Sequence, residues 1–164
     1  LKKEGLEYRG FIFFGFMIAG DEPYMIEYNC RMGDPETEVV IPRLKNDLVE
    51  LFAAVADQKL DTIKIETDPR TVCTVVAVSG GYPSDYEKGY EVKGIDDINP
   101  ADSMLFQMGT AVKDGKVVTN GGRVFCITSY GRSVFDAVEI SKEEIEKVSY
   151  NGMEYRSDIG YEFE

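Results

Sequence analysis

Two apolar runs joined by a short polar segment constrain the fold of this chain more than any other feature of its sequence. Residues 11–18 are almost all apolar, residues 20–23 (GDEP) are typical of a turn, and residues 24–29 form the second run. This order predicts the two strands of a β-hairpin. Because the run 11–18 shows no polar alternation, we expect that strand to be covered on both faces.

A helix is predicted over residues 47–58. Its apolar residues recur at helical spacing, at Leu48, Leu51, Phe52 and Val55. Asp47, with Glu50 three residues later, resembles a capping box and marks the start of the helix.

The second part of the chain is rich in β-forming residues. Strands are predicted at residues 71–79, 104–111, 115–119 and 123–130. Asp114-Gly115 and Gly121-Gly122 lie between them as predicted hairpin turns. An amphipathic helix follows at 133–148, with Ser133 and Asp136 as a weaker cap signal and apolar residues Val134, Val138, Ile145 and Val148. We therefore predict an α+β protein with one domain over residues 1–62 and a β-rich domain with a packed helix over residues 63–164.

Composition excludes several classes of function. The chain has 164 residues, no histidine and a formal net charge of −12, which argues against nucleic acid or an anionic membrane as a partner. The absence of histidine removes Ser-His-Asp, Cys-His and histidine-metal chemistry. Three widely spaced cysteines and no apolar run of membrane-spanning length indicate a cytoplasmic location.

The stretch "EYNCRMGDPETE", residues 27–38, concentrates charge directly behind the second apolar run. In a strand, alternate side chains share a face, so Glu27 and Asn29 point the same way. Carboxylate and amide oxygens suit Mg²⁺, which shares its other positions with water and substrate phosphates. The nearby Arg31 suits a carboxylate or a phosphate. The alternative is a solvated polar face on which Glu27 and Arg31 form a surface ion pair.

A helix start is predicted within the same stretch. Asp34 is a favourable N-cap residue, and Pro35 suits the first helical position. A helix N-terminus aimed at the same space would favour an anion. Asp34 alternatively serves only as a cap.

The motif "EYNCRMGDPETEVVIPRL" resembles the signature of the phosphoribosylamine–glycine ligase family, which belongs to the ATP-grasp superfamily. The segments "SGGYPSDYEKG", "GTAVKDGKVVTNGGRVFCITSYG" and "YRSDIG" resemble later parts of the same family in the same order. Met32 departs slightly from the family, which usually has Phe or Leu there. The resemblance implies the end of an ATP-grasp subdomain followed by a small β-rich C-terminal domain.

The resemblance also implies a reaction. ATP phosphorylates the carboxylate of glycine, and the amine of phosphoribosylamine attacks the acyl phosphate to give glycinamide ribonucleotide, ADP and phosphate in purine biosynthesis. The implied cofactor is Mg²⁺ or Mn²⁺, with ATP as co-substrate. By the same resemblance Glu27 and Asn29 bind the metal and the ATP phosphates. Arg31 and Asp34 take catalytic roles, Arg31 also contacting the phosphates. The substrate side of the site is formed by Gly33, Asp34, Pro35 and Glu36.

The family's remaining ATP-binding residues and its amino-terminal domain have no counterpart in these residues. We therefore expect the chain to be the C-terminal part of a longer enzyme and to be inactive alone. Two alternatives remain open: another ATP-grasp carboxylate–amine ligase, and a scaffold or binding domain without catalysis. The glycine-rich segments "SGGYP" and "NGGR" match no phosphate-loop pattern, so they are interpreted as turns.

Overall fold

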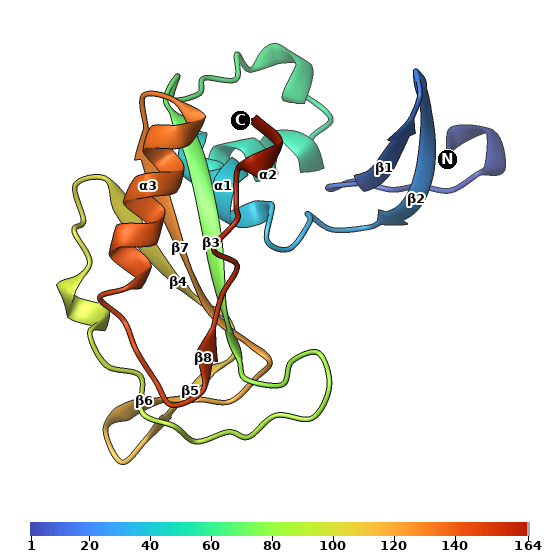
Figure 1. The fold of residues 1–164 in the computed structure, drawn as a ribbon. Coiled ribbons are helices and arrows are strands. Elements are labelled where there is room, and N and C mark those ends of the chain that lie inside the picture. The colour runs from blue at the N-terminus through green and yellow to red at the C-terminus, as the bar shows by residue number, and fades with distance from the viewer. Residues whose placement is uncertain (164) are drawn as a thin grey trace. The chain divides into compact units, whose positions relative to one another are not determined.

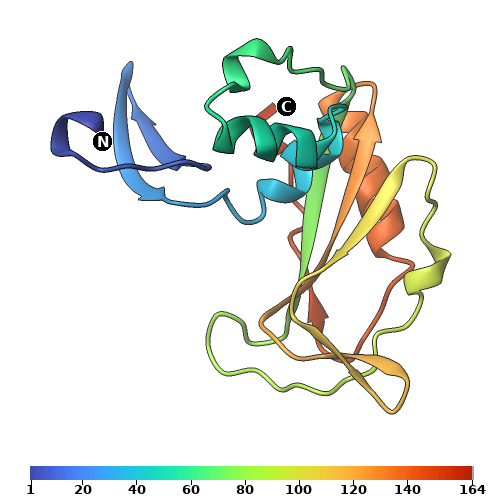
Figure 2. The same cartoon turned by 180° about the vertical axis from the view of Figure 1, so that it is seen from behind.

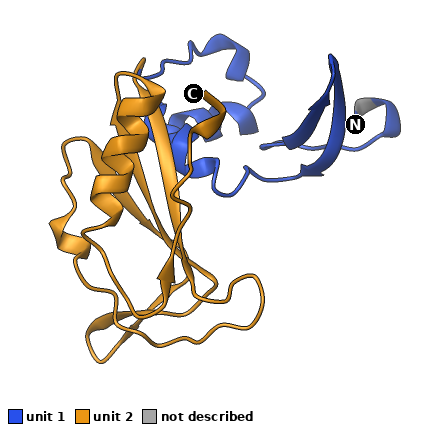
Figure 3. Ribbon diagram, in the orientation of Figure 1, with its two compact units in different colours: residues 1–68 blue, residues 69–164 orange. Residues whose placement is uncertain are grey.

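The computed structural model describes residues 1–163, which form two compact units. Unit 1 comprises Leu1–Asp68 and unit 2 comprises Pro69–Glu164 (Figure 3). The sequence placed the boundary near residue 63, shortly before this division. Both units combine antiparallel strands with helices, which confirms the predicted α+β class. Within residues 1–163, no helix combines the length and the apolar character needed to cross a membrane.

Unit 1 is a two-stranded hairpin followed by two short helices (Figure 1). Its elements are η1 (Lys2–Glu4), β1 (Phe13–Ala19), β2 (Glu22–Asn29), α1 (Thr37–Arg43), α2 (Leu48–Ala56) and η2 (Leu60–Thr62). Asp47 caps α2 as predicted, because its carboxylate accepts hydrogen bonds from the backbone N–H groups of Val49 (2.8 Å) and Glu50 (3.1 Å).

The predicted hairpin is confirmed, but its turn is shorter than the sequence indicated. Glu22 and Pro23 already belong to β2, where they pair with Ala19 and Ile18. Proline is tolerated there because, among the residues that the structure describes, β2 pairs only with β1 and its other edge carries no strand. The turn is left to Gly20, with φ of +64°, and its neighbour Asp21.

The predicted covering of the first strand on both faces is wrong. Phe14 is 49% exposed, Ile18 is 64% exposed, and Tyr28 on β2 is 64% exposed. Among the described residues β1 is hydrogen-bonded only to β2. A two-stranded sheet exposes both faces unless another layer packs on it, and the apolar pattern alone does not reveal where that layer comes from.

Unit 2 is built around a four-stranded antiparallel sheet with the strand order β4-β7-β3-β8 (Figures 1 and 2). Helix α3 (Val134–Ile145) packs against β3 and β7, the two central strands. The strands of the sheet are β3 (Thr71–Ser79), β4 (Ser103–Gln107), β7 (Arg123–Gly131) and β8 (Met153–Glu154). A separate hairpin consists of β5 (Thr110–Lys113) and β6 (Lys116–Thr119), and two single turns are η3 (Ile95–Asp97) and η4 (Tyr161–Phe163).

Two predictions for this sheet need correction. The predicted strand 104–111 is two strands, because the N–H groups of Met108 and Gly109 both donate to the Val124 carbonyl at 3.0 Å and interrupt the ladder. Gly121-Gly122 is not a hairpin turn, since β6 pairs with β5 whereas β7 pairs with β3 and β4. The predicted turn at Asp114-Gly115 is confirmed, with φ of 51° and 75°.

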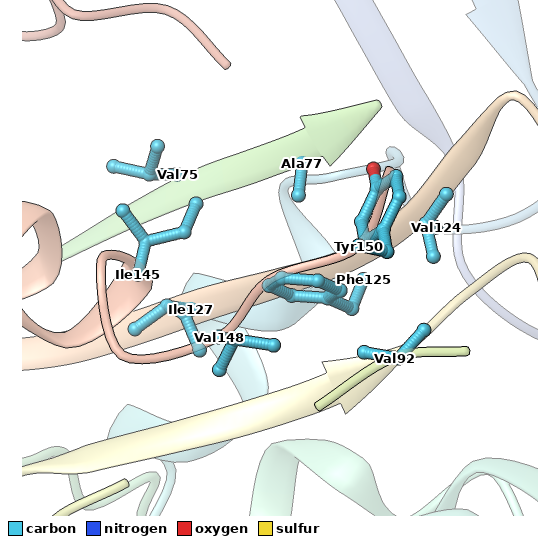
Figure 4. Packing of buried hydrophobic residues seen from close by; sticks show 9 residues of the cluster. All are labelled: Val75, Ala77, Val92, Val124, Phe125, Ile127, Ile145, Val148 and Tyr150. Carbon is cyan, nitrogen blue, oxygen red and sulfur yellow. The ribbon is translucent and has the colours of Figure 1, made fainter. Parts of the chain in front are cut away.

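The core of unit 2 combines residues of β3 and β7 with the end of α3 and with the connecting segments (Figure 4). Its buried members are Val75, Ala77, Val92, Val124, Phe125, Ile127, Ile145, Val148 and Tyr150. The predicted cap of α3 is confirmed, because the Ser133 hydroxyl accepts from the Asp136 N–H at 3.1 Å. The helix ends at Ile145, three residues earlier than predicted, yet Val148 remains in the core at 2% exposed.

A buried carboxylate ties α3 to the loop before β4. Glu144 is 6% exposed and accepts from the Asn99 N–H (3.0 Å) and from Lys147 Nζ (2.7 Å). We expect Glu144→Ala to lower the free energy of unfolding by about 1–3 kcal/mol, because it leaves the Asn99 N–H without its acceptor. Urea denaturation measures this change, and Glu143→Ala, at an exposed position next to it, is the matched control. Equal effects of the two substitutions would contradict the prediction.

Candidate functional site

Glu27 and Asn29 lie on one face of β2 near its carboxyl end. Asn29 Nδ2 is 3.4 Å from Glu27 Oε1, so the predicted shared face is confirmed. Glu27 is exposed and Asn29 is half-buried. The pair therefore presents a carboxylate and an amide at an accessible position.

A β-bulge sets the orientation of Glu27. Gly15 pairs with Glu27, but the next residue of β1, Phe16, pairs with Met25, which leaves Ile26 as the extra residue of β2. A bulge of this kind increases the local twist and redirects the side chains beside it. The bulge was not predicted, because the apolar run in the sequence continues through it.

The backbone after β2 is tethered to the segment before β1. The Tyr8 hydroxyl lies 2.6 Å from the Phe11 carbonyl oxygen and 3.1 Å from that of Cys30. Tyr8 thus fixes the point where the chain leaves the strand and enters the Arg31 region. Nothing in the residue spacing pointed to this role of Tyr8.

Arg31 is exposed, and its Nη1 donates to the Met32 carbonyl at 2.8 Å. Within residues 1–163 no ion pair joins Arg31 to Glu27. The alternative interpretation of these two residues as a surface ion pair is therefore not what the structure shows. The exposed guanidinium of Arg31 still has further N–H groups that can donate to an anion.

Gly33 is buried in a tight turn. Its carbonyl accepts from the N–H (3.1 Å) and from Oγ1 (2.5 Å) of Thr37. A Cβ at Gly33 would lie 2.3 Å from Glu36 Oε2 and 2.9 Å from Phe13 Cε2. The Glu36 carboxylate and the edge of the Phe13 ring therefore occupy the space that a side chain at this position would take.

The predicted helix start at Asp34 and Pro35 is wrong. Helix α1 begins at Thr37, and Glu36 occupies the N-cap position without a side-chain capping bond. The hydrogen bond from the Thr37 N–H to the Gly33 carbonyl closes a turn over residues 33–37. The Asp34-Pro35 peptide bond within this turn is cis. The helix N-terminus expected beside Asp34 as an anion site is consequently absent there. Asp34 and Pro35 lie in the turn that follows Arg31.

The oxygen donors at the carboxyl end of β2 are few. No group of three or more His, Cys, Asp or Glu residues in the described part of the chain is placed to hold a metal ion. Glu27 and Asn29 offer one carboxylate and one amide oxygen instead. Such a sparse oxygen set fits Mg²⁺, which keeps several waters and shares substrate phosphates, and it does not fit a closed zinc cage.

The glycine-rich segment SGGYP of unit 2, residues 79–83, forms a turn as predicted, whereas Gly121-Gly122 of NGGR connects β6 to β7 without a hairpin turn. The Gly80 N–H donates to the Gly152 carbonyl (2.7 Å), and the Tyr82 N–H donates to the Ser79 carbonyl (3.0 Å). A Cβ at Gly122 would lie 2.2 Å from the Tyr82 ring. The N–H groups of Gly80 and Tyr82 already have backbone acceptors, which supports the interpretation of SGGYP as a turn and not as a phosphate-binding loop.

Comparisons with known proteins agree on one family. The model described as "Phosphoribosylglycinamide synthetase, C domain" matches residues 72–162, and the model of the ATP-grasp (A) domain of the same synthetase matches residues 1–37. A phosphoribosylamine–glycine ligase of Caldanaerobacter subterraneus is 43% identical over 97% of this chain, and that of Pseudomonas putida is 47% identical over 98%.

A solved structure extends this comparison to the fold. The crystal structure of phosphoribosylamine–glycine ligase from Thermotoga maritima matches 96% of this chain with a TM-score of 0.75 and 38% identity. The chain spans 38% of the length of that protein and of the two curated relatives. The stretch from Glu27 to Glu36 lies inside the ATP-grasp match.

Proposed function

Because the chain belongs to the phosphoribosylamine–glycine ligase family, we propose that it forms the C-terminal part of an ATP-dependent ligase that joins glycine to phosphoribosylamine. The product is glycinamide ribonucleotide, an intermediate of purine biosynthesis. The observation that carries the proposal is the Glu27–Asn29 pair on one face of β2, within the residues that match the ATP-grasp domain.

The proposed reaction has two steps. A carboxylate oxygen of glycine attacks the γ-phosphorus of ATP, and ADP leaves with the electrons of the broken P–O bond. The amine nitrogen of phosphoribosylamine then attacks the acyl carbon, phosphate leaves, and the nitrogen loses a proton as the amide forms. The first step converts a poor leaving group into a good one, which is why a ligase of this kind consumes ATP.

Glu27 and Asn29 are proposed to hold Mg²⁺ or Mn²⁺. When bound, the metal would neutralise charge on the phosphates of ATP. Glu27 contributes an anionic oxygen that is already exposed. In the structure the Asn29 amide directs Nδ2 toward Glu27. A half-turn of the amide about the Cβ–Cγ bond would place Oδ1 on that side instead.

The residues of the turn after β2 are proposed to contact the transferred phosphoryl group and the substrate. Arg31, with its exposed guanidinium, would stabilise the transferring phosphoryl group or the acyl phosphate. Asp34 is assigned a catalytic role and contacts with the substrate. The substrate side of the site is shaped by Gly33, Asp34, Pro35 and Glu36. The turn bonds from Thr37 to the Gly33 carbonyl support this assignment, because they hold the segment in one conformation.

The proposal also divides the chain between domains. Residues 1–62 are assigned to the end of the ATP-grasp domain and residues 63–164 to the C-terminal domain, which the two family matches support. The remaining ATP-binding residues and the amino-terminal domain would belong to the longer ligase. We place the enzyme in the cytoplasm, where its free cysteines stay reduced, with neither nucleic acid nor membrane as a partner.

A carboxylic-acid exchange tests the proposed substrate. ADP release by the full-length ligase that carries this chain is measured with phosphoribosylamine generated in situ and with glycine, alanine, β-alanine or acetate. The proposal predicts release with glycine and only background release with the others. Release with another acid would move the chain to a different carboxylate–amine ligase. A folded protein that turns over no ATP would favour a scaffold role.

The isolated chain of residues 1–164 is expected to show no glycine-dependent ADP release. The exposed Glu27 and the half-buried Asn29 can contribute only part of an ATP site. The measurement is a coupled ADP assay, with the full-length ligase as positive control and Glu27→Gln in the isolated chain as background control. Glycine-dependent release from the isolated chain that Glu27→Gln abolishes would contradict this prediction.

A further inference from the structure

We propose that Gly15 is a positioning residue for Glu27: the missing side chain on β1 provides the space in which the Glu27 carboxylate takes its metal-binding orientation. This inference rests on the proposed function, because it concerns the same metal site. It assigns a role to a residue that carries no charge and no polar group.

The strand pairing places Gly15 directly opposite Glu27. Paired residues of antiparallel strands point their side chains to the same face, so Gly15 lies under the Glu27 side chain. On this face of β1 the neighbouring residues are Phe13 and Met17, both large. Gly15 is therefore a gap in a row of bulky side chains, and the gap lies at the candidate ligand.

The Glu27 side chain occupies that gap. A Cβ added at Gly15 would lie 3.1 Å from Glu27 Cγ and 3.9 Å from Glu27 Oε1. The first distance is shorter than an ordinary carbon–carbon contact of about 3.5–4.0 Å. A side chain at this position would push Glu27 Cγ away and change the direction of the carboxylate relative to Asn29.

Backbone conformation does not require glycine at this position. Gly15 is not among the residues with positive φ, in contrast to Gly20, which has φ of +64° in the hairpin turn. Glycine inside a strand weakens the strand and often marks a close approach by another group. The close group here is the side chain of Glu27, which makes space for that side chain the reason for Gly15.

The test measures metal binding and does not depend on turnover. Mn²⁺ alone is titrated into the full-length ligase that carries this chain, and free Mn²⁺ is followed by its EPR signal. Because the chain is acidic, with a formal net charge of −12, nonspecific binding is expected. Binding that disappears in Glu27→Gln defines the site, and only that component is compared among variants.

Gly15→Ala is expected to raise the Kd for Mn²⁺ of this component about 3–10-fold. Removing a group that hydrogen-bonds to a metal ligand typically costs about 10–100-fold, and a steric change at Gly15 is expected to cost less. Gly15→Val is expected to raise it further. Met17→Ala, which alters the same face of β1 opposite Tyr24, is the control and is expected to leave the Kd unchanged. Thermal melting of Gly15→Ala should be no lower than that of the wild type, because alanine suits a strand better than glycine.

The outcomes separate this inference from the proposed function. Wild-type Mn²⁺ affinity in Gly15→Ala and Gly15→Val, together with loss of binding in Glu27→Gln, would overturn the role of Gly15 and leave the metal site in place. A wild-type protein without any component that depends on Glu27 would overturn the metal site, and the role of Gly15 with it. Equal losses in Gly15→Ala and Met17→Ala would show a general effect of the β1 face and would also overturn the inference.

Discussion

Replacing Glu27 by glutamine in the full-length ligase is expected to lower kcat/KM for Mg²⁺·ATP by about 100-fold or more, since removing even an outer-shell partner of a metal ligand often costs 10–100-fold. Glutamine keeps the shape of the side chain and removes its charge. Glu27 is exposed and shares its face with the half-buried Asn29, so little packing is lost. The melting temperature should therefore remain that of the wild type.

Glu22→Gln provides a matched control for this substitution. Glu22 lies on the same strand, is also exposed, and pairs with Ala19 beside the hairpin turn. Its replacement removes the same charge from β2 and is expected to leave kcat/KM unchanged. The Mg²⁺ concentration needed for half-maximal activity should rise only in Glu27→Gln. Wild-type turnover in Glu27→Gln, or equal losses in both variants, would show that Glu27 is not a metal ligand.

Truncation of Phe125 to alanine is expected to lower the free energy of unfolding of this chain by about 3–5 kcal/mol, as buried Phe→Ala substitutions do. Phe125 is 1% exposed and lies in the middle of the core cluster (Figure 4). Its ring meets that of Tyr150 edge to face, with centroids 6.1 Å apart and an interplanar angle of 78°. The substitution removes both the buried apolar area and this aromatic contact.

Phe135→Ala is the corresponding surface control. Phe135 lies on α3 and is 53% exposed, so its truncation should change stability much less than that of Phe125. Urea denaturation followed by circular dichroism measures both variants. Because neither residue belongs to the candidate site, any activity lost in the full-length ligase should follow the loss of folded protein. Similar destabilisation by the two truncations would contradict the description of the core.

The elements that the sequence predicted well are those fixed by local interactions. The strand predicted at 71–79 is β3, Thr71–Ser79, because a run rich in β-branched residues suits a central strand with buried Val75 and Ala77. The caps at Asp47 and Ser133 were also predicted, since each side chain bonds to an N–H two or three residues later.

The features that the sequence did not reveal depend on pairing between distant residues. The break between β4 and β5 arises because two N–H groups share the Val124 carbonyl, and the bulge at Ile26 arises from its pairing with β1. Neither changes the apolar pattern. The helix start at Asp34 was misplaced for a related reason. Hydrogen bonds from Thr37 to the Gly33 carbonyl close a turn before the helix, and Glu36 fills the space beside Gly33.

The candidate site shows the same division. Alternation along a strand was sufficient to place Glu27 and Asn29 on one face, and the structure confirms that placement. The contribution of Gly15 required the cross-strand register, and that of Tyr8 required a contact to Cys30, which is 22 residues away. Polar residues that can bind a ligand are recognisable in a sequence. The space that their side chains require depends on residues of the neighbouring strand and is not recognisable there.

The decisive measurement is the formation of the amide product by the full-length ligase. Full-length ligase carrying this chain is incubated with Mg²⁺, ATP, ¹³C-carboxyl glycine and phosphoribosylamine generated in situ, and the carbonyl carbon is followed by NMR together with ADP. We expect conversion of the glycine carboxylate to an amide, with one ADP released per amide and no conversion when either ATP or phosphoribosylamine is left out. ATP hydrolysis without amide formation would contradict the proposed ligase reaction, and amide formation at the wild-type rate in Glu27→Gln would contradict the role of Glu27.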